Sequence, residues 1–200
     1  MTKRDNYHHG QLRDDLVDQA EELIGESGAH SWSMREAARR LGVSQAAPYR
    51  HFSDKAALID AVVLRGYGQL EDRYGKALHR CSGEADRVIS VAMAYYQFGV
   101  DKPEVFSLMF SSPRLHTTAE ALQSYQVFED EVGAAQERRE LAPGPARDQT
   151  HALWGAAHGM AELVNRKVFG PHHGKKVARL TLAATIRGLS PVRDAGRSAG

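Results

Sequence analysis

The stretch LGVSQAAPYRHFSDK, residues 41–55, decides the fold that we expect for the N-terminal part of the chain. It begins with Leu-Gly-Val-Ser, in which the glycine can end one helix and Ser44 can cap the next. Two short helices joined by a tight turn that contains glycine are typical of a helix-turn-helix. The stretch therefore predicts a helix-turn-helix whose second helix is very short, near residues 44–50.

Helical signals lie on both sides of this stretch. Apolar residues recur at helical spacing over residues 12–28, which predicts a first helix. Ser33 and Glu36 have the spacing of a capping box, which predicts another helix over residues 33–41. After the stretch, apolar residues again recur at helical spacing, and we expect a helix that runs to about residue 80. The turn at 41–44 thus has a predicted helix before it and another soon after it.

The side chains of the short second helix suit contact with DNA. Ala46 and Ala47 are small, so the helix can enter a major groove about 12 Å wide. Gln45 can pair with adenine, and Arg50 can reach guanine or a phosphate. Pro48 lacks the N–H that a helix uses, and we expect it to stiffen the entry to this helix.

Neighbouring polar side chains are expected to hold the DNA backbone. Tyr49 and His51 can donate hydrogen bonds to phosphates. Lys55 lies in the first turn of the next helix, whose free N–H groups form an anion site, so it can complete a phosphate clamp. The predicted DNA contacts are Ser33, Arg35, Ser44, Gln45, Ala46, Ala47, Tyr49, Arg50, His51 and Lys55.

The rest of the chain predicts helices only, because no long run alternates between apolar and polar residues. The helices expected after residue 80 cover about 88–102, 103–110, 117–140, 147–169 and 175–188, with a loop at 141–147 and a turn at 170–174. The tail, residues 190–200, is expected to be disordered. The sequence thus predicts an all-α protein with about nine helices.

Composition limits the class of protein without naming its partner. The 200 residues have a net charge of +1, and residues 1–55 carry 8 basic against 9 acidic side chains, so a DNA-binding prediction rests on the motif and not on bulk charge. Residues 31–55 alone are basic, with 5 positive against 2 negative side chains. The single cysteine, Cys81, fits a reducing cytoplasm. No apolar run is long enough to cross a membrane, and the N-terminus does not resemble a secretory signal.

Residues 7–60 resemble the TetR/AcrR family of bacterial transcriptional repressors. The matching pieces are the helix of residues 12–28, SMREAARRLGVS at 33–44 and YRHFSDKAAL at 49–58. The resemblance implies a helix-turn-helix domain over residues 1–55 and a helical effector-binding and dimerisation domain over residues 56–189. It also implies a homodimer that binds a palindromic operator in double-stranded DNA, with half-sites about 34–36 Å apart. Many family members carry an apolar residue such as leucine where this chain has Pro48.

The C-terminal part offers candidates for the dimer interface and for the effector site. Small residues at helical spacing let two helices approach closely, and the family pairs its last two helices across the dimer. The predicted interface residues are Ala152, Gly155, Ala156, Gly159, Leu163, Ala178, Leu182, Thr185 and Ile186. The alternative is that these faces pack only within one subunit.

Aromatic residues and a methionine suggest a pocket for a small hydrophobic or aromatic effector. The candidates are Tyr95, Phe98, Phe106, Met109, Phe110, Tyr125, Phe128, Trp154 and His158. Trp154, His158 and Gly159 resemble a Trp-His-Gly signature of one TetR subgroup. A core tryptophan beside a hydrogen-bonded histidine explains Trp154 and His158 equally well.

Other chemistry finds little support in the sequence. The ten histidines and one cysteine do not have the spacing of a structural zinc site, and no catalytic triad or phosphate-binding glycine loop is present. We expect no cofactor, no metal and no enzymatic activity. Two alternatives to an effector-controlled repressor stay open: a constitutive DNA-binding protein without an effector, and a helical small-molecule-binding protein that does not bind DNA.

Overall fold

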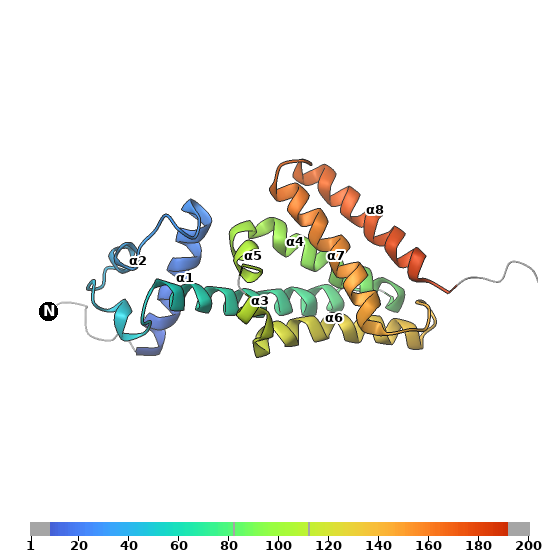
Figure 1. Ribbon diagram of the computed structural model, residues 1–200, viewed down its shortest axis with the longest axis horizontal. Coiled ribbons are helices and arrows are strands. Elements are labelled where there is room, and N and C mark those ends of the chain that lie inside the picture. Colours follow the sequence, from blue (N-terminus) through green and yellow to red (C-terminus); the bar gives the residue numbers. More distant parts are fainter. Residues whose placement is uncertain (1–8, 82, 112, 192–200) are drawn as a thin grey trace, which may run out of the picture. The chain divides into compact units, whose positions relative to one another are not determined.

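The computed structural model describes residues 9–81, 83–111 and 113–191, and these residues form an all-helical fold without strands (Figure 1). The α-helices are α1 (His9–Ser27), α2 (Met34–Arg40), α3 (Lys55–His79), α4 (Arg87–Asp101), α5 (Pro103–Met109), α6 (Ala119–Glu137), α7 (Ala146–Asn165) and α8 (Pro171–Leu189). Three short 3₁₀-helices, η1 (Pro48–Arg50), η2 (Glu84–Asp86) and η3 (Pro113–Thr117), lie between them. The all-α prediction is confirmed.

Two of the predicted helical boundaries were wrong for reasons of local chemistry. The predicted helix at 44–50 is a turn followed by the 3₁₀-helix η1, and the predicted turn at 170–174 is the start of α8. Pro171 occupies the first turn of α8, where a missing N–H costs nothing because those N–H groups have no intrahelical partner. Proline followed by two histidines was therefore a helix start rather than a turn.

The described chain divides into two compact units. The N-terminal unit contains the residues up to Gly68 together with Lys102–Ala121, and the C-terminal unit contains Gln69–Asp101 together with the residues from Leu122 onward. The division falls inside α3, whereas the predicted domain boundary after residue 55 falls at the start of α3. Of the predicted disordered tail, residues 192–200 lie outside the described residues.

The core of the N-terminal unit is built on α1, which contacts both α2 and α5. The buried face of α1 includes Leu16, Ala20 and Ile24, whose spacing of four residues places them on one side of the helix. Charged pairs join segments distant in sequence: the Lys102 ammonium binds the Glu21 carboxylate, and the Arg65 guanidinium binds Asp18. These ion pairs join α1 to α3 and to the residue before α5.

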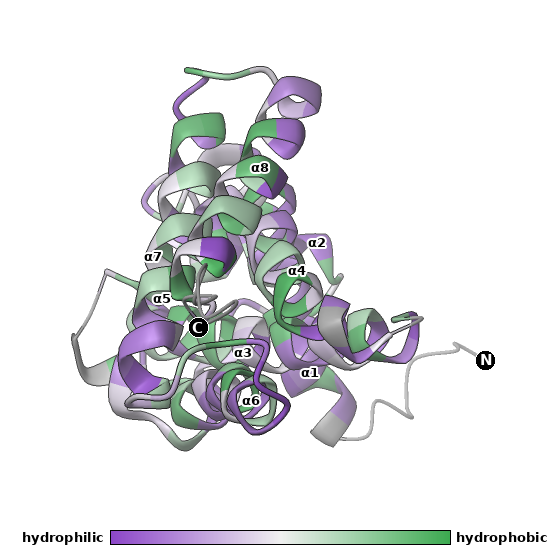
Figure 2. Ribbon diagram, turned by 90° about the vertical axis from the view of Figure 1, so that its right-hand side faces the viewer, coloured by the Kyte–Doolittle hydropathy of each residue, from purple (hydrophilic) through white to green (hydrophobic). Residues whose placement is uncertain are grey.

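In the C-terminal unit, α4 packs against α7 and α8, and α7 and α8 lie side by side after a short connection (Figure 1). The buried face of α4 carries large rings, Tyr95, Tyr96 and Phe98, each exposing 2% or less of its surface. Hydrophilic and hydrophobic residues are interspersed along α8 (Figure 2). Within the described part of the chain, no helix combines the length and the apolar character that crossing a bilayer needs.

Candidate functional site

Helix α2 is held in place by its cap and by its buried face. The Ser33 hydroxyl accepts a hydrogen bond from the backbone N–H of Glu36 at 3.2 Å, which confirms the predicted cap. Met34, Ala37 and Ala38 are buried. Since these residues fix the rotation of α2, the guanidinium of Arg35 is exposed to solvent.

The turn after α2 depends on Gly42. Its φ of +68° lies in the left-handed region that residues with a side chain disfavour. The backbone N–H of Val43 then donates to the carbonyl of Ala38 at 3.0 Å, which closes the helix end. The chain leaves α2 in a defined direction and enters residues 44–50, which we call the reading segment.

Proline explains why the reading segment is not an α-helix. In an α-helix capped by Ser44, the first N–H to bond the Ser44 carbonyl would be that of residue 48, and Pro48 has none. The carbonyl of Ser44 instead accepts from the N–H of Ala47 at 2.9 Å, one residue earlier. Pro48 begins η1, and its own carbonyl accepts from the N–H groups of His51 and Phe52, both at 3.0 Å. The expectation that Ser44 caps a helix was therefore wrong.

The reading segment exposes most of the side chains predicted to contact DNA. Ser44, Gln45, Ala46, Tyr49 and Arg50 are all exposed, and Tyr49 exposes 53% of its surface. Ala47 exposes only 8% and packs inward with Pro48, so it does not present the small exposed side chain that was predicted to contact DNA. The surface of the segment is polar and aromatic while its inner side is apolar.

Exposed cations on the same part of the chain differ in their partners. The Arg39 guanidinium donates two hydrogen bonds to the Glu36 carboxylate at 2.8 and 2.7 Å. Arg40 binds both oxygens of Glu26 at 2.8 and 2.7 Å, and also reaches Glu36. The hydrogen bonds from Arg39 and Arg40 lower the pKa of Glu36 to about 2, so its carboxylate stays charged in acid well below neutral pH.

The guanidinium groups of Arg35 and Arg50, by contrast, form no hydrogen bond or ion pair with any other described residue. The same holds for the side chains of Gln45 and Tyr49. Charged and hydrogen-bonding groups without partners keep their full capacity for a ligand in solution. Of the basic side chains in residues 31–55, only the guanidinium groups of Arg35 and Arg50 have no hydrogen-bond or ion-pair partner among the described residues.

Lys55 is engaged inside the N-terminal unit. Its ammonium donates to the backbone carbonyls of Trp32 at 2.7 Å and His30 at 3.3 Å, and it lies 4.6 Å from the centre of the Trp32 ring. Partial burial lowers the pKa of Lys55. These contacts join the start of α3 to the loop before α2, a bracing role that the prediction of a phosphate clamp did not include. His51, also predicted to contact phosphate, is partly buried.

The predicted effector residues separate into packed and partly exposed groups. Phe98, Phe106, Met109 and Phe128 expose 2% or less, as does Tyr95. Phe106, Met109 and Phe110 belong to the N-terminal unit, and the other candidates belong to the C-terminal unit. Tyr125, Trp154 and His158 are partly exposed.

Aromatic rings of α4, α6 and α7 form a chain of contacts within the C-terminal unit. The Tyr95 hydroxyl lies 2.9 Å from Nδ1 of His158, and the Tyr95 ring meets the Trp154 ring edge-on with centroids 6.3 Å apart. His151 continues the chain, 6.3 Å from Trp154 and 5.5 Å from Tyr125. Burial lowers the pKa of His158, which favours the neutral imidazole beside the tyrosine hydroxyl.

The predicted interface residues lie in two environments. On α7, Ala152, Gly155, Gly159 and Leu163 are exposed and follow one another at spacings of three or four residues. On α8, Ala178 and Leu182 are 0% exposed and pack within the subunit, so their assignment to a dimer surface was wrong. Ala156, Thr185 and Ile186 are partly exposed.

Comparison with known proteins identifies the family. Residues 16–62 match the model of the bacterial regulatory proteins of the tetR family, and residues 88–187 match a tetracyclin repressor-like C-terminal domain. The chain belongs to the TetR family. Its N-terminal match includes α2, the reading segment and the start of α3, so the protein is a DNA-binding transcriptional regulator. The TetR family also indicates a second copy of the chain as a partner.

Solved structures agree over nearly the whole length. A Rhodococcus sp. RHA1 protein of unknown function is 28% identical, with a TM-score of 0.81 over 94% of this chain and 100% of its own. A TetR-family regulator from Pectobacterium atrosepticum is 16% identical, with a TM-score of 0.74 over 96% of this chain and 99% of its own. A TetR/AcrR regulator from Thermobifida fusca is 17% identical, with a TM-score of 0.69 over 90% and 99%. No curated protein matches the chain.

Two features of the TetR-type N-terminal unit escaped the sequence prediction. The pairing of Arg39 and Arg40 with Glu36 was available from their spacing of three and four residues, which places them on one helix face. The anchoring of Lys55 on the carbonyls of His30 and Trp32 had no local signal, because 25 and 23 residues separate the partners.

Proposed function

We propose that the protein is a transcriptional repressor that reads operator DNA through Gln45, Tyr49 and Arg50. Gln45 pairs with a base in the major groove, and Arg50 contacts guanine or a phosphate. Tyr49 and Arg35 hold the DNA backbone. Ser33, Ser44 and Ala46 lie exposed close to them in sequence and complete the contact surface.

One observation carries this proposal. The side chains of Arg35, Gln45, Tyr49 and Arg50 are exposed and have no hydrogen-bond or ion-pair partner among the described residues, while Arg39 and Arg40 nearby are bound to carboxylates. Side chains that stabilise nothing in the free protein are suited to an external polyanion. DNA supplies both phosphate oxygens and base edges for them.

We further propose that the repressor is a dimer formed through α7. Its exposed stripe of Ala152, Gly155, Gly159 and Leu163 allows another helix to approach closely. A two-fold dimer presents two reading segments, so the operator is a palindrome with half-sites about 34–36 Å apart. Because its target is bacterial DNA, we propose that it works in the cytoplasm.

The effector that we propose is a small hydrophobic or aromatic molecule. Tyr125, Trp154 and His158 are aromatic side chains that keep partial exposure, and the Tyr95 hydroxyl beside His158 supplies a polar contact. For release, the effector must bind more tightly to a dimer geometry that fits the operator poorly. The fully packed candidates, such as Phe98 and Phe128, would support this region from behind.

The first test is a gel-shift titration with DNA from the region flanking the protein's own gene, against scrambled DNA, at two salt concentrations. We expect specific retention that weakens at higher salt, because phosphate contacts release counterions. The Tyr49→Ala variant should lose affinity for all sequences, and Gln45→Ala should lose discrimination between operator and scrambled DNA. Unchanged affinity and discrimination in both folded variants would refute the assignment of the reading segment.

The effector proposal is tested separately by thermal unfolding in the presence of a panel of aromatic and aliphatic compounds. A compound that binds the native protein raises the melting temperature. The shift should be smaller in Trp154→Ala, and the same compound should release the operator in the gel-shift assay. Operator binding with no compound effect would favour a constitutive regulator instead.

A further inference from the structure

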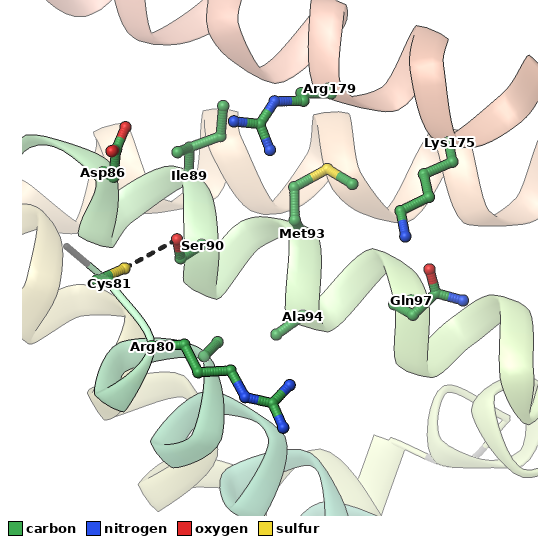
Figure 3. A pocket seen from close by; sticks show the side chains of 11 residues that line it. Arg80, Cys81, Asp86, Ile89, Ser90, Met93, Ala94, Gln97, Lys175 and Arg179 are labelled. Atoms are coloured by element: carbon green, nitrogen blue, oxygen red, sulfur yellow. Dashed lines mark hydrogen bonds between the residues drawn. The ribbon is translucent and has the colours of Figure 1, made fainter.

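A groove in the C-terminal unit lies apart from the aromatic residues discussed above. Its floor is one face of α4, formed by Ile89, Ser90, Met93 and Ala94, which recur at spacings of three and four residues (Figure 3). These four side chains are partly exposed, whereas the opposite face of α4 is buried in the core. The helix therefore offers a second, mainly apolar surface that the fold does not use.

Cations border this floor on two sides. Lys175 and Arg179 project from α8 on one side, and Arg80 lies on the other side, just after the end of α3 (Figure 3). Lys175 and Arg179 are four residues apart, so they share one face of α8. The side chains of these three residues form no hydrogen bond or ion pair with another described residue. Three positive charges thus face one groove without internal compensation.

The remaining polar groups of the groove leave it with a net positive charge. Asp86 is the one acidic residue in its lining and lies at one end, and Gln97 lies toward the other end (Figure 3). The Gln97 amide donates to Asp101 at 2.8 Å, and the Cys81 thiol donates to the Ser90 hydroxyl at 3.0 Å. With Cys81, Ser90 and Gln97 satisfied inside the protein, the lining offers chiefly cations and apolar atoms to a ligand.

We propose that this groove binds a small anionic amphiphile, a molecule with a carboxylate or phosphate group joined to a short apolar body. The cations of α8 take the anionic group through charge-assisted hydrogen bonds. Ile89, Met93 and Ala94 take the apolar body. The cavity volume of about 340 Å³ suits a small molecule.

Size and charge together favour this class over the alternatives. A purely inorganic anion would leave the apolar floor in water, and a neutral apolar molecule would leave three cations unused. An acidic helix of another protein would cover far more surface than this groove encloses. The inference does not depend on the proposed effector, because the groove contains none of the residues proposed to bind it.

Calorimetric titration of the full-length protein with four probes tests the proposal. Octanoate and octyl phosphate carry both features of the ligand, 1-octanol carries only the apolar body, and inorganic phosphate carries only the charge. We expect both amphiphiles to bind at least about tenfold more tightly than either single-feature probe, because each feature contributes separately. The ratio of octanoate to octyl phosphate affinity identifies whether the carboxylate or the phosphate is preferred.

Substitutions locate the bound probe. Replacing Lys175 and Arg179 together by glutamine should weaken octanoate binding by about tenfold or more. Replacing Lys176 and Arg187 together by glutamine, an equal loss of two charges at exposed α8 positions outside the groove, should leave it unchanged. Met93→Gln should weaken the two amphiphiles but not inorganic phosphate. Circular dichroism and the melting temperature identify any variant that fails to fold.

Three results would overturn the proposal. The first is 1-octanol binding as tightly as octanoate, which would remove the role of the cations. The second is equal octanoate affinity in the folded double variant and the native protein. The third combines two observations: the native protein binds no amphiphile, and the double variant differs from it in association state by sedimentation. That result would assign the groove to a second copy of the chain.

Discussion

The reading segment and the bundle of α4, α7 and α8 are held in opposite ways. The segment is a short run of 3₁₀ turns with two inward residues, Ala47 and Pro48. Its exposed side chains Gln45, Tyr49 and Arg50 form no hydrogen bond or ion pair with another described residue. The bundle buries large rings, among them Tyr96 and Phe98, between closely packed helices. Substitutions on the segment's surface should therefore change DNA affinity at constant stability, while substitutions in the bundle should change stability.

Helix α8 lies close to its neighbours at Gly174. A Cβ atom built on this glycine would lie 2.2 Å from Cγ2 of Val164 and 3.2 Å from the Tyr96 hydroxyl oxygen. A valine methyl group is held by a stiff, branched side chain and yields little. The absence of a side chain at Gly174 is therefore what lets α8 approach α7 and α4.

The largest effect is expected for Gly174→Ala, which should lower the free energy of unfolding. The 2.2 Å contact places the overpacking cost at the upper end of its usual range, about 3 kcal/mol, and the better helix propensity of alanine returns about 1, so we expect a net loss of about 2 kcal/mol. Urea denaturation measures this loss. Gly75→Ala, at an exposed α3 position with no atom within 4 Å of the added Cβ, is the matched control and should be neutral or stabilising.

The same substitution in a Val164→Ala background checks the cause. Removing the valine methyl groups opens the space that the new Cβ needs, so Gly174→Ala should cost clearly less there than in the native protein. Equal costs in both backgrounds would show that the contact with Val164 does not limit the approach of α8. Either way, operator affinity per folded molecule should remain near that of the native protein.

The reading segment should respond in the reverse manner. Arg50→Ala should lower operator affinity by about 1.5 kcal/mol, roughly tenfold, because one contact to a base or phosphate is lost. Its free energy of unfolding should stay within about 0.5 kcal/mol of the native value, as for other exposed side chains without partners. Fluorescence anisotropy with labelled operator and urea denaturation measure the two quantities.

Arg39→Ala is the matched control for Arg50→Ala. It removes the same charge from an exposed position nearby, but Arg39 is already bound to Glu36. We expect a smaller loss of affinity for Arg39→Ala than for Arg50→Ala. Equal losses in the two variants would mean that general charge, and not the free guanidinium of Arg50, supports binding.

This contrast also explains which features could be predicted from the sequence. The turn at Gly42, the cap at Ser33 and the run of helices rest on local spacing, and local spacing is readable in a single chain. The failure of the 44–50 helix was also readable, since Pro48 has no N–H for the Ser44 carbonyl. The exposure of Gln45, Tyr49 and Arg50 agrees with their prediction as DNA contacts, whereas the burial of Ala47 was not predicted.

Prediction was weaker wherever distant segments meet. The burial of Ala178 and Leu182 depends on which face of α8 turns toward its neighbours, and a stripe of small residues does not distinguish an internal face from a dimer face. Aromatic residues such as Phe98 and Phe128 are equally suited to a core and to a pocket. The cationic groove was not predicted because Arg80 and Arg179 lie almost a hundred positions apart in the sequence.

Lys55 combines features of both regions: it was predicted to contact DNA, and in the structure it is bound to backbone carbonyls within the fold. Lys55→Met removes its hydrogen bonds to the carbonyls of His30 and Trp32 and should lower the free energy of unfolding by about 1 kcal/mol. Operator affinity should also fall, because the brace supports the loop before α2. Urea denaturation and anisotropy measure both effects.

The salt dependence of operator binding separates bracing from direct phosphate contact by Lys55. A lost phosphate contact reduces the slope of log affinity against log salt concentration by about 1. For Lys55→Met we expect an unchanged slope with a lower affinity at every salt concentration. A slope reduced by about 1, with native stability, would return Lys55 to the set of DNA contacts.

The smallest effect concerns pH and lies in the bundle. Burial lowers the pKa of His158 in the folded protein below its value of about 6.5 in an unfolded chain. Between these two pKa values the unfolded chain binds more protons than the folded protein, so stability is lost as the pH falls from about 6.5 toward the folded-state pKa. The loss should be small, since His158 is only partly buried and solvent screens its charge.

His158→Gln removes the titrating group while keeping a polar side chain beside the Tyr95 hydroxyl. We expect its free energy of unfolding to fall less than that of the native protein between pH 7 and pH 5. His173→Gln, an exposed histidine on α8, is the control and should follow the native profile. If His158→Gln and the native protein have the same dependence of stability on pH, the His158 imidazole binds protons equally well in the folded protein and in the unfolded chain. The contrast between the packed bundle and the open reading segment would then not extend to this residue.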